Sequence, residues 1–204
     1  MDQTEFLHIY WEYYLEIEQQ FYNTKRYVDF NNNNFKTYSL EYLQLLQTTC
    51  SEIDVIAKVI AKLNGYDLSS NVNIQKWGYA LSNEYPNISN TSIVFNKTYC
   101  IIPWEKFGYV YVSNREGKMI HKLSDGAQNP EWWKSYNKAK HERTKVLQNG
   151  KANYTRANLE NVINAMGALL IIEGILFELL EGDNVCPIDN SCLFSCVTIP
   201  TKHL

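Results

Sequence analysis

The first 65 residues repeat their hydrophobic positions at steps of three and four, the spacing of one face of an α-helix. Over residues 4–29 the repeating positions are Phe6, Ile9, Tyr10, Tyr13, Ile17 and Phe21. The asparagine run 31–34 interrupts the pattern, because asparagine favours turns. Ser39 has the side chain of an N-cap and Gly65 suits a helix end. Between them the repeating positions are Leu43, Leu46, Cys50, Ile53, Ala57 and Ile60. We predict two long helices, each with an apolar face that needs a partner.

The middle of the chain changes its pattern. A shorter helix is predicted over residues 74–81. The segments 92–102 and 107–112 are then rich in β-branched and aromatic residues, and residues 114–117 supply a turn before 118–122. These features predict a small β or loop insertion at about residues 90–125.

Two further helices are predicted in the last third of the chain. Asn129, Pro130 and Glu131 combine a capping side chain, a first-turn proline and an early acid, and this fourth long helix is predicted to end near Gly150. Thr155 is predicted to cap a fifth, which runs to about residue 180. Residues 183–204 are predicted to be an irregular tail. The chain is thus expected to be mainly α, a helical bundle of one domain spanning 1–204.

Composition sets limits on location and on partners. Hydrophobic residues make up 45% of the 204 residues and the net charge is −3, so that any site for a polyanion has to be a local basic patch. The N-terminus lacks the basic start and apolar core of a secretory signal. The most apolar stretch, 166–180, is interrupted by Glu173 and Glu178, and we expect a buried partner for Glu173. A cytoplasmic location without a membrane span is predicted.

No cofactor or metal is predicted. Cys50 and Cys100 lie among apolar residues and are expected in the core. The tail cysteines lack a Cys-x-x-Cys pair and have a single histidine nearby; these residues are Cys186, Cys192, Cys196 and His203. A Gly-rich phosphate loop, a His-x-x-x-His pair and a G-x-S-x-G elbow are all missing from the sequence, which disfavours the corresponding hydrolases.

The predicted fourth helix carries the most promising chemistry. Asn137 and His141 are four residues apart and share one face. An imidazole that titrates near neutrality beside fixed cations suits proton transfer next to a phosphate. The cations of this stretch are Lys134, Lys138, Lys140 and Arg143, and its aromatic residues are Trp132, Trp133 and Tyr136. The aromatic rings either stack on bases or anchor the helix in the core, and the cations either bind a substrate or form a solvated face.

Two stretches resemble a known superfamily. Residues 132–143 read W-W-x-x-Y-N-x-x-K-H-x-R and are followed by Ala157-Asn158-Leu159. This pattern resembles a group of uncharacterised prokaryotic proteins related to the HEPN superfamily. Residues 50–58 resemble the helix with acids and a lysine that precedes the histidine helix in that group.

The resemblance implies a helical bundle that often dimerises. Many HEPN proteins are metal-independent ribonucleases of toxin–antitoxin, abortive-infection and other phage-defence systems, and their signature is an arginine, often followed by a polar residue, with a histidine four to six positions after the arginine. His141 matches the histidine and Asn137 the polar residue. Tyr136 stands at the arginine position, with Lys134 one turn earlier, while Lys140 or Arg143 would have to supply the missing charge.

The helix at 39–65 offers acids that the site needs. Asp54 and Lys58 are four residues apart and can form a surface ion pair. Alternatively, Glu52 or Asp54 faces His141 or Arg143 across the bundle and orients it.

Three functional hypotheses follow, the third of which is a purely structural helper whose aromatic surface docks another chain. In the first, the chain is a HEPN-like toxin or phage-defence component that acts on RNA through the Asn137–His141 face as a metal-independent endoribonuclease. In the alternative, it is a catalytically inactive HEPN-like module that binds a nucleotide, RNA or a protein partner from a neighbouring gene. In the first two we expect a homodimer whose interface lies beside the histidine helix.

Overall fold

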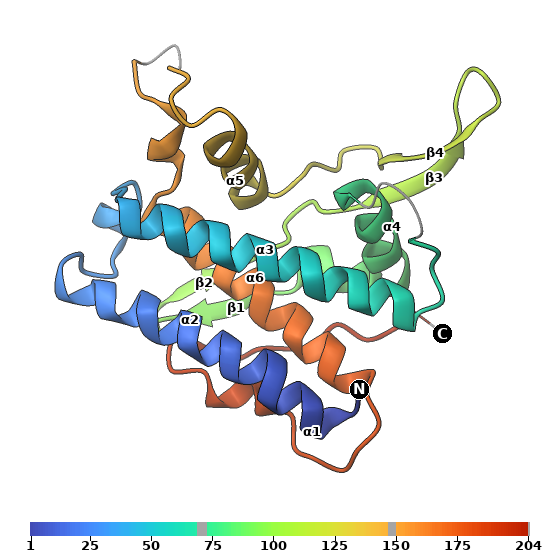
Figure 1. Ribbon diagram of the computed structural model, residues 1–204, viewed down its shortest axis with the longest axis horizontal. Helices are drawn as coiled ribbons and strands as arrows, with labels where there is room; N and C mark the ends of the chain where they lie inside the picture. The colour runs from blue at the N-terminus through green and yellow to red at the C-terminus, as the bar shows by residue number, and fades with distance from the viewer. Residues whose placement is uncertain (69–72, 147–149, 204) are drawn as a thin grey trace.

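The computed structural model describes residues 1–68, 73–146 and 150–203. The chain is mainly α, as the sequence predicts. Helix α6 (Leu159–Glu178) crosses the centre of the molecule and packs lengthwise against α3 (Leu40–Leu63) (Figure 1). Nearly every residue of α6 is buried.

Helix α6 is long and apolar enough to cross a membrane by length and composition, but 89% of its apolar window is buried inside the protein. It is therefore the core helix of the fold. Its N-cap is Asn158, whose side chain accepts a hydrogen bond from the backbone N–H of Asn161. The prediction that Thr155 caps this helix is wrong, because Thr155 lies in the preceding 3-10 turn η5 (Asn153–Arg156) and donates to the carbonyl of Ala152.

The N-terminal helix contains a π-helical turn that changes which residues are buried, and the hydrophobic spacing of the sequence does not reveal it. It comprises α1 (Gln3–Phe6), a π-helical turn (Leu7–Trp11) and α2 (Glu12–Asn23). The wider π turn inserts one residue, and the buried face therefore passes from Phe6 to Trp11 and Tyr14. Ile9 and Tyr13, which the predicted stripe includes, are 59% and 42% exposed. The helix continues only into a 3-10 turn, Thr24–Arg26, rather than to residue 29.

The next two helices follow the sequence more closely. Ser39 caps α3 as predicted, by accepting a hydrogen bond from the N–H of Tyr42, and Cys50 is buried within this helix. Helix α4 (Ile74–Glu84) ends three residues later than predicted and is followed by the 3-10 turn Pro86–Asn90. The asparagine run forms a short 3-10 turn, Asn32–Asn34.

The strands form two small antiparallel sheets. Strands β3 (Tyr109–Ser113) and β4 (Met119–Leu123) make a hairpin that projects from the same side of the molecule as helix α5 (Glu131–His141) (Figure 1). Strands β1 (Ile93–Phe95) and β2 (Tyr99–Ile101) pair with β5 (Phe194–Ser195) in the order β2-β1-β5. The tail therefore contains a strand and a 3-10 turn, Pro187–Asn190, and is not wholly irregular. Cys100, expected in the core, is exposed on edge strand β2.

Buried Glu18 of α2 fixes the middle of this tail, at residues 191–193. Its carboxylate accepts hydrogen bonds from the hydroxyls of Tyr14 and Ser191 and from the backbone N–H groups of Cys192, at 3.0 Å, and Leu193, at 3.4 Å. Because backbone donors entering the core must be satisfied, one carboxylate here stabilises a turn that is more than 170 residues away in sequence.

Glu173 occupies the middle of α6 without the buried partner that the sequence suggests. The side chain is fully buried, and neither carboxylate oxygen accepts a hydrogen bond. Burial, together with the charge of Glu52 on α3, raises its pKa well above the usual value. Tyr10 in the π turn interacts electrostatically with both acids. The carboxyl group is therefore stable in the core only in its neutral form.

Replacing Glu173 with glutamine should remove the free-energy cost, which grows with pH, of keeping this carboxyl protonated in the folded core. Below about pH 4 the carboxyl is protonated in the folded and in the unfolded chain. Between this pH and the raised pKa of the folded state, the carboxyl is ionised in the unfolded chain and still protonated in the folded one. Each pH unit in that window lowers the free energy of unfolding by up to about 1.4 kcal/mol. In urea titrations at pH 4, 6 and 8, the stability of Glu173→Gln relative to wild type should rise with pH. Glu178→Gln, an exposed position on α6, is the control; a difference for Glu173→Gln that does not change with pH would contradict the assignment.

Candidate nucleic-acid interface

Helix α5 packs against both α3 and α6, as its apolar stripe predicts. It ends at His141, nine residues before the predicted end at Gly150, so Arg143 lies beyond the helix. Asn129 is not its cap: the side-chain oxygen of Asn129 accepts a hydrogen bond from the hydroxyl of Tyr109, and the N-terminus of α5 has no side-chain cap. This different use of Asn129 ties α5 to the hairpin.

The tryptophans of α5 are core anchors. Trp132 Nε1 donates to the carbonyl of Pro103 at 2.8 Å, and its ring lies edge-on to that of Trp104. Trp133 packs edge-on against Trp77 of α4, with ring centroids 5.4 Å apart. Both α5 tryptophans are buried, and Trp133 therefore does not serve as an open stacking surface for a base.

A polar cluster joins α3, α4 and α5 above these rings. Asp54 accepts hydrogen bonds from Trp77 Nε1, at 2.9 Å, and from Lys58 Nζ. Lys140 Nζ donates to the Tyr136 hydroxyl at 3.0 Å and lies 5.2 Å from the centroid of that ring. The Tyr136 hydroxyl, and Asp54 to a smaller degree, raise the pKa of Lys140. The structure therefore gathers four of the residues singled out in the sequence, and the Asp54–Lys58 ion pair is formed.

His141 stands outside this cluster. Its side chain is exposed and makes no hydrogen bond or ion pair within residues 1–68, 73–146 and 150–203. Glu52 instead lies near Glu173 and Tyr10. The Asn137 amide donates to the Trp133 carbonyl at 3.0 Å, one turn back in the same helix. The expectation that Glu52 or Asp54 orients His141 or Arg143 is therefore not met.

The chain after α5 folds back beside the helix. Asn153 donates from its side chain to the carbonyl of Glu142 and from its backbone to that of Lys145, while Tyr154 donates to the carbonyl of Arg143. This return brings two cations to the α5 surface that were not singled out in the sequence, Lys145, which pairs with Glu142, and Arg156, which pairs with Glu131.

Two acids hold part of this charge in ion pairs. Glu142 lies 3.2 Å from both Lys138 and Lys145, and these lysines lower its pKa. Glu131 lies 3.0 Å from Lys134 and 3.1 Å from Arg156. Lys140 and exposed Arg143 have no ion-pair partner in the part of the chain that the structure describes.

We define residues 131–156 as the basic segment. It holds five lysines, two arginines and a histidine against two glutamates, although the whole chain has a net charge of −3. The next 45 residues, 157–201, contain six acids and neither lysine nor arginine. Counting charge by segment would have revealed this division in the sequence, whereas a motif centred on His141 did not.

Neither a metal-ligand cluster in the described part of the chain nor a match to a known protein accompanies this site. Within the described residues, no group of three or more His, Cys, Asp or Glu side chains is arranged to hold a metal ion. Comparisons with protein-family models, with curated proteins and with solved structures found no match to this chain.

Proposed function

We propose that this chain is a HEPN-like module of the cytoplasm that binds RNA through the basic segment. The observation that carries the proposal is the concentration of positive charge on α5 and the returning chain, in a protein that is otherwise acidic. Cations held close together on one surface attract the phosphate backbone and release its counterions.

The cationic side chains of the basic segment differ in how well they can bind a phosphate. Arg143 is exposed, carries a permanent charge and has a guanidinium that can grip a phosphate with two parallel hydrogen bonds. Lys140 is anchored by the Tyr136 hydroxyl and therefore offers a positioned charge. The lysines that share Glu142 contribute less, because part of their charge is already balanced.

Several contacts favour binding over cleavage. Tyr136, at the position of the HEPN arginine, is buried, and its single hydroxyl supplies neither the permanent charge nor the paired N–H donors with which a guanidinium holds a phosphate. The exposed imidazole of His141 also lacks an acid to fix its orientation among the described residues. We therefore favour the inactive RNA-binding module over the nuclease. Its place in a toxin–antitoxin or phage-defence system is part of the same proposal.

The homodimer stays a prediction. The tryptophans of α5 are buried and are not available for a dimer interface, but a two-fold axis near α5 would bring two basic segments together around one RNA.

Neutralising Lys140 and Arg143 together should weaken RNA binding. On a single strand the plot of log affinity against log salt has a negative slope of about 0.7 per phosphate contact. The double variant Lys140→Gln/Arg143→Gln should therefore have a slope that is less steep by about 1.4. Its affinity at low salt should fall by roughly tenfold. Fluorescence anisotropy with a labelled single-stranded RNA over a range of salt concentrations measures both quantities.

The matched control is Lys25→Gln/Lys62→Gln, which removes the same charge from two exposed positions outside the basic segment. This control should keep nearly the wild-type affinity. An equal loss in both double variants would mean that only net charge matters and would remove the basic segment as the interface.

Cleavage by His141 is the second candidate, because this imidazole is exposed and lies close in sequence to Lys140 and Arg143. We expect labelled RNA incubated with the wild-type protein and a chelator to remain intact on a denaturing gel. His141→Ala runs beside it, with circular dichroism to verify its helices. Wild-type cleavage that disappears in His141→Ala would replace the binding module with a metal-independent ribonuclease.

A further inference from the structure

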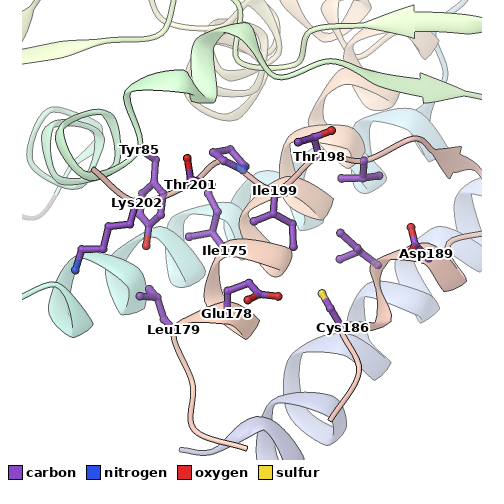
Figure 2. A pocket seen from close by; sticks show the side chains of 13 residues that line it. Tyr85, Ile175, Glu178, Leu179, Cys186, Asp189, Thr198, Ile199, Thr201 and Lys202 are labelled. Carbon is purple, nitrogen blue, oxygen red and sulfur yellow. The ribbon is translucent and has the colours of Figure 1, made fainter. Parts of the chain in front are cut away.

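A cavity of about 670 Å³ lies between the second half of α6 and the tail (Figure 2). Its size falls in the range of small-molecule binding sites. Ile175 and Leu179 of α6 line one side, and Ile188, Val197 and Ile199 of the tail line the other. The lining is therefore mainly apolar, as in sites that hold the body of an organic ligand.

The tail forms a fixed wall of this cavity. Glu18 holds residues 191–193, and Glu84 holds the other end through its backbone carbonyl, which accepts from His203 N–H at 2.7 Å, and through an ion pair with Lys202 at 3.6 Å. Gly174 lets the wall approach α6, since a Cβ at this position would lie 3.0 Å from Ile199 Cγ1. The cavity is thus built by contacts distributed over α2, α4 and α6.

Two exposed carboxylates lie at the rim of this cavity, on different elements. Glu178 comes from the end of α6 and Asp189 from the 3-10 turn of the tail, and both line the cavity around Cys186 (Figure 2). Burial raises the pKa of the Cys186 thiol, and the charges of Glu178 and Asp189 raise it further. Neither acid has an ion-pair or hydrogen-bond partner in the described chain, whereas the cavity's one lysine, Lys202, is paired with Glu84.

We propose that this cavity binds an organic cation, a primary amine carried on an apolar or aromatic body. The ammonium group would lie between Glu178 and Asp189, and the body would cover Ile175, Ile188 and Ile199. An anionic ligand is disfavoured, because the two rim acids would repel it and the lysine that lines the cavity, Lys202, is already paired with Glu84. A metal ion is disfavoured as well, since Cys186 and the two acids are not arranged as a ligand set.

Cys186 provides a reporter inside the cavity. Tryptamine is a suitable probe, with tryptophol and indole-3-propionate as neutral and anionic analogues of the same shape. We expect saturating tryptamine to slow alkylation of Cys186 by iodoacetamide at least about fivefold, because the bound ring covers the thiol. The rate is followed by mass spectrometry of the Cys186 peptide. Exposed Cys100, on strand β2, is the reference within the same molecule and should react at an unchanged rate.

Variants separate the two carboxylates from general surface charge. Glu178→Gln/Asp189→Asn should weaken the protection by tryptamine about tenfold, as expected for the loss of two charge contacts at the rim. Glu181→Gln/Asp183→Asn removes the same charge from exposed positions that do not line the cavity and should behave as wild type. Equal protection by tryptophol, an equal loss in the control variant, or no protection by tryptamine would each overturn the proposal.

Discussion

The burial of α6 on all its faces is the constraint on which the rest of the structure depends. A helix that is apolar all round is stable in a protein only when every face is covered. Helix α3 covers one face along its length, and the N-terminal helix, α5, strand β1 and the tail cover the others. Two glycines allow close approach: a Cβ at Gly167 would clash with Ile93, and one at Gly174 would crowd Ile199. The positions of both proposed binding surfaces follow from this arrangement.

The sequence predicts the helices that have regular stripes and local caps. Ser39 illustrates this, because its hydrogen bond to the N–H of Tyr42 depends only on neighbouring residues. Features that depend on distant contacts escape prediction. Asn129 bonds to Tyr109 instead of capping α5, strand β5 forms only because β1 is available, and the π turn exposes Ile9 and Tyr13 without any break in the hydrophobic spacing.

The candidate site shows the same difference between features that neighbouring residues determine and features that distant contacts determine. The residue types on α5 indicate phosphate chemistry, but their contacts depend on the rotation of the helix. Successive residues on a helix are about 100° apart, so that Lys140 lies close enough to Asp54 to feel its charge while His141 points to solvent. The sequence suggested that an acid of α3 would face α5, and Asp54 does so; it could not specify that a lysine rather than the histidine would be near it.

The fixing of the tail by Glu18 has a consequence for synthesis of the protein. Helix α6 leaves the ribosome before residues 191–203, which means that its tail-facing surface is exposed while the rest of the bundle is already available. The closing contacts join residues more than 170 positions apart, a separation that slows folding because a long loop must be ordered first. The nascent chain is therefore most prone to aggregation just before the tail emerges, and a chaperone that covers apolar surface would act at this stage.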